Sequence, residues 1–137
     1  MWETTVEGEP SIDREVVRVT QAGSAVTVQN EDVSADNPVG GYLWRGNCTL
    51  HDNTYVMGSY EALDPNDRQR GVLFYTLHRS GRFMVGHWVG CTYDTDLFDG
   101  LSVLARTQED ARTQFNKAYG KEVLQPASTS TGGNGSA

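Results

Sequence analysis

Two alternating stretches near the middle of the chain constrain its fold more than any other feature. Residues 71–77 and 82–90 are rich in apolar, β-branched and aromatic residues, and Ser80-Gly81 between them is typical of a tight turn. A turn there predicts a β-hairpin whose cross-strand pairs are Leu77 with Met84, Tyr75 with Gly86, and Leu73 with Trp88. A four-residue loop would keep the same residues on one face, because side chains alternate with a period of two.

Both faces of this hairpin are apolar. The first face carries Leu73, Tyr75, Leu77, Met84 and Trp88. The second carries Phe74, Phe83, Val85, His87 and Val89. Glycines at positions 86 and 90 predict the strand curvature that a closing barrel needs. We therefore expect the first face to line a barrel interior and another element to cover the second.

A second hairpin is predicted from residues 16–21 and 24–29, which flank a turn at Ala22 and Gly23. Val17, Val19, Val26 and Val28 then share one face, and Arg18, Thr20, Thr27 and Gln29 lie on the other, which is typical of a half-buried antiparallel sheet. Pairing Gln21 with Ser24 sets the register, with Val19 opposite Val26 and Val17 opposite Val28.

A third hairpin is predicted from residues 42–50 and 54–60, turning at Asp52 and Asn53. We expect His51 to pair with Thr54. The resulting pairs are Leu50 with Tyr55, Cys48 with Met57 and Gly46 with Ser59, and Tyr42 and Trp44 share their face. This register points Met57 into the barrel.

The C-terminal part of the chain predicts one helix. Thr107 is a good N-cap, acidic residues follow it in the first turn, and Gly120 is a typical helix end. The apolar stripe of the helix consists of Ala111, Phe115, Ala118 and Tyr119. We expect this stripe to pack on the second face of the central hairpin, around Phe83, Val85 and Val89.

Residues 2–7 and 101–105 complete the predicted strands, and segments 8–14 and 91–100 are expected to be loops. The predicted fold is mainly β, with eight antiparallel strands in up-and-down (meander) order closed into a barrel, and one C-terminal α-helix. Residues 1–120 would form this β-barrel and helix. Residues 121–137, rich in Ser, Thr and Gly, are expected to be a disordered tail.

Composition and charge limit the classes of partner that we expect for the chain. The net charge is −7 and only two lysines occur, which argues against a nucleic-acid polymer as partner. No apolar run is long enough for a membrane span, and the N-terminus lacks a signal peptide, so we expect a cytoplasmic protein without a membrane partner. Cys48 and Cys91 are then expected to be free thiols, with a disulfide as the alternative. The sequence leaves the oligomeric state open.

Four short motifs around the central hairpin resemble a lipocalin-like, or calycin, small β-barrel module of uncharacterised bacterial proteins. They are Arg70-Gly71, Gly81-Arg82, Met84-Val85-Gly86-His87-Trp88-Val89-Gly90, and Gly100-Leu101-Ser102-Val103-Leu104-Ala105-Arg106. The match covers about half of the chain, which lacks the helix-turn-helix domain that some of these proteins carry. The resemblance implies a barrel that binds a small molecule, and a similar minimal barrel occurs in bacterial antiviral receptors that sense cyclic nucleotides.

The predicted inward-facing side chains are the candidate ligand-binding residues, and the alternative is a filled core. They are Tyr42, Trp44, Met57, Tyr75, Met84 and Trp88. In a meander the longer loops gather at one end, and here twelve acidic residues lie in or beside them, offset by only three arginines. This charge would favour a cationic or neutral ligand there, although acidic loops also serve solubility. The short-turn end carries His51, His78, Arg79 and Arg82, so an anion could dock there instead.

No catalytic residue and no cofactor is predicted. On a strand, His87 and Cys91 share a face but lie about 13 Å apart at ~3.3 Å per residue. Cys48 and His51 are an odd step apart and point to opposite faces unless the turn intervenes, so no zinc or other metal site is expected. Residues 94–100 only partly match a calcium loop, because the third carboxylate is displaced and position 105 is alanine. The leading hypothesis is a non-enzymatic carrier, sponge or sensor of a small ligand. The alternatives are a protein–protein interaction module that uses the outer sheet and the helix, a cyclic-nucleotide-sensing barrel, and a barrel-housed enzyme.

Overall fold

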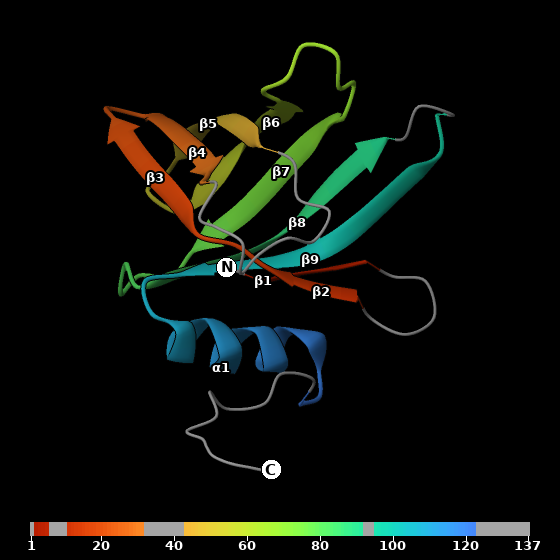
Figure 1. Ribbon diagram of the computed structural model, residues 1–137. Helices are drawn as coiled ribbons and strands as arrows, with labels where there is room; N and C mark the ends of the chain where they lie inside the picture. Colours follow the sequence, from red (N-terminus) through yellow and green to blue (C-terminus); the bar gives the residue numbers. More distant parts are fainter. Residues whose placement is uncertain (1, 6–10, 32–42, 92–94, 123–137) are drawn as a thin grey trace.

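One antiparallel sheet and one helix make up the fold in the computed structural model, which describes residues 2–5, 11–31, 43–91 and 95–122 (Figure 1). The strands are β1 (Trp2–Thr5), β2 (Ser11–Arg14), β3 (Val17–Ala22), β4 (Ala25–Asn30), β5 (Trp44–His51), β6 (Tyr55–Ala62), β7 (Arg70–Leu77), β8 (Phe83–Cys91) and β9 (Leu97–Ala105), and helix α1 (Gln108–Tyr119) follows. The sheet order is β2-β1-β9-β8-β7-β6-β5-β4-β3. Strands β3 to β9 therefore form a seven-stranded meander, which curls into a half-barrel.

The prediction of eight strands closed into a barrel is not supported. Residues 11–14, expected in a loop, form β2, which pairs with β1 as a hairpin beside β9. Closure would require β3, at one edge of the sheet, to pair with β2 at the other, and no such pairing occurs among the described residues. Strand β9 also begins at Leu97, inside the segment predicted as the loop 91–100. The predicted tail lies outside the described residues from position 123 onward.

The register of the central hairpin is confirmed. Leu77 pairs with Met84, Tyr75 with Gly86 and Leu73 with Trp88. The loop between the two strands has the four residues 79–82, because the His78 amide donates to the Phe83 carbonyl at 3.0 Å. Gly81 in this loop has a φ of 74°, which favours glycine. The loop length is even, so the predicted faces are preserved.

The hairpin of β3 and β4 has the predicted faces but a different register. Ala22 pairs with Ala25, so the turn lies at Gly23-Ser24. Gly23 has a φ of 63°, which suits glycine at the first turn position. The shift moves each pairing by two residues, so the four valines still share one face. Val19 is nevertheless exposed, because β3 is an edge strand.

The register of the hairpin of β5 and β6 differs from the predicted register by one residue. His51 pairs with Tyr55 instead of Thr54, and Leu50 pairs with Val56. Asp52 and Asn53 both have positive φ, and Thr54 is an additional residue in the turn whose hydroxyl donates to the Asp52 carbonyl. A shift of one residue turns every side chain of β6 to the other face. Met57 and Tyr55 therefore point outward, whereas Val56 and Tyr60 point inward.

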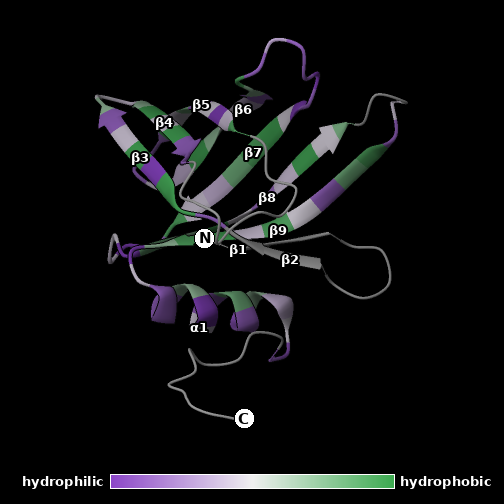
Figure 2. Ribbon diagram, in the orientation of Figure 1, coloured by the Kyte–Doolittle hydropathy of each residue, from purple (hydrophilic) through white to green (hydrophobic). Residues whose placement is uncertain are grey.

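The main core fills the concave face of the half-barrel. Its buried members are Val26, Val28, Trp44, Cys48, Val56, Tyr60, Leu73, Tyr75, Met84, Trp88 and Leu104. Figure 2 shows the alternation of hydrophobic and hydrophilic residues along the strands that supplies this face. All five side chains predicted on the first face of the central hairpin belong to this core or pack against it. A polar pair is enclosed with them, because the Tyr75 and Ser102 hydroxyls lie 2.9 Å apart and both residues are fully buried.

Helix α1 begins and ends as predicted. The Thr107 side chain accepts a hydrogen bond from the Asp110 amide, and Gly120 is left-handed with its amide donating to Asn116. The helix covers the outer face of β9, where Ala111 and Phe115 pack with Leu101 and Val103. It reaches Val85 of β8, but not Val89, which remains exposed, and Ala118 is exposed as well. The helix was expected over β8 but lies about one strand away, over β9, because only residues 106 and 107 connect it to β9.

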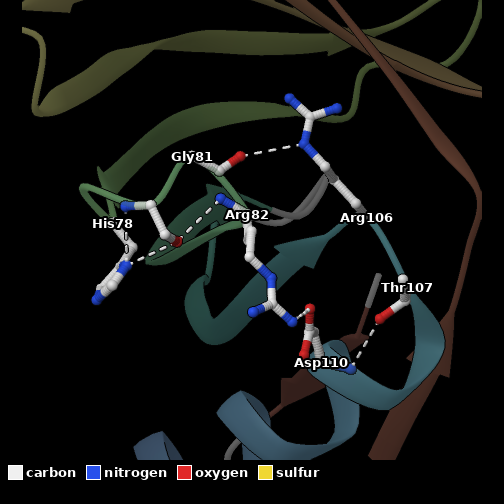
Figure 3. Close-up of polar contacts among 7 residues, drawn as sticks. His78, Gly81, Arg82, Arg106, Thr107 and Asp110 are labelled. Carbon is white, nitrogen blue, oxygen red and sulfur yellow. Dashed lines mark hydrogen bonds and ion pairs between the residues drawn. The ribbon is translucent and has the colours of Figure 1, made fainter.

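Polar contacts fasten the start of the helix to the central hairpin (Figure 3). The Arg82 guanidinium lies 2.6 Å from the Asp110 carboxylate. Arg106 donates through Nε to the Gly81 carbonyl at 3.1 Å. These contacts hold α1 beside the turn between β7 and β8, and they already engage Arg82, one of the cations considered for an anion site.

A pair of glycine substitutions tests how closely the strands approach one another. A Cβ atom at Gly86 would lie 1.8 Å from the backbone oxygen of Phe74, whereas one at Gly46 would lie 2.8 Å from the Leu73 side chain and no closer than 3.6 Å to a backbone atom. We expect Gly86→Ala to lower the free energy of unfolding by about 3 kcal/mol and the control Gly46→Ala by about 1 kcal/mol or less. Urea denaturation followed by circular dichroism measures both. Equal losses would contradict the close backbone approach.

The buried hydroxyl pair gives a second test. Tyr75→Phe leaves the Ser102 hydroxyl without its partner, so we expect a loss of about 1–3 kcal/mol in the free energy of unfolding. The double variant Tyr75→Phe/Ser102→Ala should recover part of that loss, because no buried hydroxyl then remains. A complete double-mutant cycle by urea denaturation would show additive effects if the hydrogen bond contributed nothing.

Candidate ligand-binding site

Four aromatic side chains gather at one end of the concave face. Trp44 is the first residue of β5, Tyr60 lies near the end of β6, Trp88 lies near the end of β8, and Phe98 is the second residue of β9. These are the strand ends joined by the β4–β5, β6–β7 and β8–β9 connections. Trp44, Tyr60 and Trp88 are buried, and Phe98 packs partly buried against them.

The rings form two edge-to-face pairs. The centroids of Trp44 and Tyr60 are 6.0 Å apart, and those of Trp88 and Phe98 are 5.3 Å apart with an interplanar angle of 85°. The pairs meet at Gly90, where an added Cβ would lie 2.4 Å from the Tyr60 hydroxyl and 3.4 Å from the Trp88 ring. Glycine at this position thus makes room for the aromatic row, which we define as Trp44, Tyr60, Trp88 and Phe98.

Two polar residues fix one end of the aromatic row. The Asn30 side chain accepts a hydrogen bond from the Trp44 amide at 2.7 Å and donates one to the Glu15 carboxylate at 2.7 Å. The Trp44 indole nitrogen donates to the same carboxylate oxygen at 3.4 Å. Asn30 is 4% exposed, so this small network lies inside the fold. It holds a carboxylate against the first indole of the row.

The second indole of the row has no such partner. Trp88 is 8% exposed, and its Nε1 atom is buried without a hydrogen-bond acceptor. Buried tryptophan N–H groups usually find an acceptor, and leaving one unpaired costs about 1–3 kcal/mol. The concave face therefore contains a hydrogen-bond donor that the described part of the chain leaves unused.

The structure separates the predicted ligand-binding residues. Trp44 and Trp88 lie in the aromatic row, whereas Tyr75 and Met84 face inward nearer the short turns, where Tyr75 bonds Ser102. The prediction that Met57 faces inward is wrong, because Met57 lies on the convex face with 37% of its surface exposed. Tyr42 lies outside the described residues.

The sequence prediction misses four residues of the site, and one of them is Phe98, which lies in the segment predicted as the loop 91–100. Tyr60 was assigned to the outer face by the one-residue register error. Asn30 was placed in a loop, and Glu15 next to one, since no local pattern marks a hydrogen bond that crosses between strands. A turn of three residues after His51 places Tyr60 on the inward face.

The charges near the site are mostly negative. Described acidic residues at this end of the half-barrel, besides Glu15, are Glu31, Glu61, Asp64, Asp67, Asp96 and Asp99. The described arginines there are Arg18, which forms an ion pair with Glu31, Arg45, which lies opposite Glu61, and Arg68 and Arg70. Such a potential attracts cations and repels anions. The arrangement can supply a hydrogen-bond donor from Trp88 beside aromatic rings and can tolerate positive charge.

The cysteines and histidines do not converge. Cys48 faces the concave core, whereas His51, His87 and Cys91 face the convex side, and no disulfide joins the two cysteines. No cluster of three or more metal-ligating side chains occurs within residues 2–5, 11–31, 43–91 and 95–122. Burial raises the pKa of the Cys48 thiol, which lowers its thiolate fraction at neutral pH and does not favour a nucleophilic role.

The chain matches no family model, and neither a curated protein nor a solved structure shows significant similarity to it. In the described part of the chain, no helix combines the length and apolar character that a membrane crossing needs.

Thiol labelling tests the inward position of Cys48. We expect iodoacetamide to modify the half-buried Cys91 faster than Cys48 near neutral pH, because burial disfavours the Cys48 thiolate. The raised pKa contributes stability below the unfolded-state value of about 8.5, and this contribution is lost as pH rises through the folded-state pKa. Intact and peptide masses over time measure the labelling, with Cys48→Ser as control. If the two cysteines of the folded protein were labelled at equal rates, Cys48 would have to lie at the surface.

Proposed function

We propose that the chain is a cytoplasmic, lipocalin-like half-barrel that binds one small ligand non-covalently on its concave face, as a carrier, sponge or sensor. The observation that carries this proposal is the buried Trp88 Nε1 atom, for which the described residues provide no acceptor within a row of aromatic rings. A calycin relationship is part of the proposal. The antiparallel half-barrel with its C-terminal helix is compatible with it.

The residues of the row define the chemistry of the ligand. Aromatic faces suit a flat apolar or aromatic body, and the Trp88 N–H suits an acceptor atom attached to that body. The Glu15 carboxylate and the surrounding acidic side chains favour a neutral or cationic molecule over an anion. A cyclic nucleotide, which carries phosphate charge, is therefore the less favoured alternative at this end.

Native mass spectrometry of the purified chain tests the proposal. We expect a retained small molecule, released on denaturation, whose mass identifies its chemical class. Trp88→Phe keeps a ring in the row but removes the donor, so it should retain roughly tenfold less of that molecule, the equivalent of about 1.4 kcal/mol. The apo form of the variant should lose little stability, because removal of the unpaired donor offsets part of the cost of the smaller ring in the core.

The matched control is Tyr75→Phe, which also removes a polar atom from a concave aromatic residue, but away from the row. It should retain the ligand at the wild-type level. A chain that carries no small molecule in any preparation, together with a Trp88→Phe variant that is strongly destabilised, would identify the row as a filled core.

A further inference from the structure

The convex face of the sheet is divided into a polar half and an apolar half. On β4 and β5 the outward residues are polar, as in Thr27, Gln29, Arg45, Asn47 and Thr49. On β6, β7 and β8 several large apolar side chains are exposed instead. We call these the convex patch, and its members are Tyr55, Met57, Val72, Phe74 and Val89. The solvent-facing side of a half-buried antiparallel sheet normally carries polar residues, as β4 and β5 do here.

Strand pairing makes the convex patch contiguous. Met57 pairs with Phe74, and Val72 pairs with Val89 on the next strand. The rings of Tyr55 and Phe74 lie 6.0 Å apart. The outward residues interspersed with them are Ser59, Thr76 and His87. The patch thus has no Asp, Glu, Lys or Arg within it, and the charged residues Glu61, Arg70 and Asp99 lie at its border.

Helix α1 covers the adjoining part of the same face but stops short of the patch. It buries Leu101 and Val103 of β9 and packs against Val85 of β8. Val89, farther along β8, remains 38% exposed, and Val72 on β7 is 54% exposed. The chain therefore buries one part of its apolar convex face with its own helix and leaves the other part for a second surface.

The size of the convex patch matches the apolar part of a dimer interface. From their exposed fractions, the five side chains present roughly 400 Å² of mostly apolar surface. A standard interface buries about 800 Å² on each partner, of which about 56–65% is apolar. One patch against a second copy of itself therefore supplies nearly the apolar area that a stable dimer needs, and the polar residues around it supply the rest.

Charge favours a second copy over a charged partner. A basic or acidic peptide would find no opposite charge within the convex patch to pair with. Two copies of this chain, each with a net charge of −7, repel each other elsewhere on their surfaces, but a two-fold contact through the patch brings uncharged residues against uncharged residues.

We propose that the chain forms a two-fold symmetric homodimer through the convex patch of β6, β7 and β8. The two concave faces then point away from each other, so the dimer leaves both ligand sites accessible. This inference is independent of the proposed ligand, because it uses the opposite face of the sheet.

Sedimentation velocity of the full chain, from about 1 to about 200 μM, tests the dimer. We expect a concentration-dependent dimer for wild type. Val72→Glu and Phe74→Glu should each weaken the dimer roughly a hundredfold in Kd, because each would bury an unpaired carboxylate. The matched control Thr20→Glu adds the same charge to the exposed outward face of edge strand β3, at the far side of the convex face from the patch, and should dimerise like wild type.

Circular dichroism checks that the three variants remain folded, which is expected because all three side chains are exposed. A wild-type chain that sediments as a monomer throughout the concentration range would overturn the proposal. So would a dimer that both patch variants form as well as wild type, since the contact would then lie elsewhere. A different protein that occupies the patch in the purified sample would replace the second copy as its partner.

Discussion

The curvature of the sheet depends on places where two strand backbones approach more closely than any side chain allows. Added Cβ atoms at Gly58, Gly71 and Gly86 would lie 1.8–2.0 Å from backbone oxygens of the neighbouring strands. These glycines lie on β6, β7 and β8, in the middle of the meander, and they allow it to bend. Bending brings the concave side chains together into one core and spreads the convex side chains apart.

This difference between the faces organises the rest of the molecule. On the concave side, the half near the short turns is closed by apolar packing and by the Tyr75–Ser102 hydrogen bond. The other half contains the aromatic row, where the Trp88 donor is left unpaired and a carboxylate is held nearby. On the convex side, the helix covers β9 and leaves the convex patch open. Stability, the proposed ligand site and the proposed dimer contact therefore occupy separate regions of one sheet.

Local sequence patterns were sufficient where a single turn or cap determines the structure. The central hairpin was predicted in register because its loop is even in length, and both helix ends followed from Thr107 and Gly120. The alternation also placed Trp44 and Trp88 inside, so two members of the aromatic row were predicted as inward-facing. The register of β5 and β6 failed because one extra turn residue, Thr54, reverses the faces of the whole following strand.

The sequence by itself therefore determined the antiparallel meander, the strand faces beside even-length turns, and the single capped helix, because these depend on neighbours in the chain. Only the tertiary structure decided the open edge between β2 and β3, the position of α1 over β9, and the meeting of Glu15, Asn30 and Trp44. These features depend on which distant strands pair and on how far a two-residue connection can reach. The unpaired Trp88 nitrogen belongs to the same class, since whether a buried donor is satisfied depends on every strand that surrounds it.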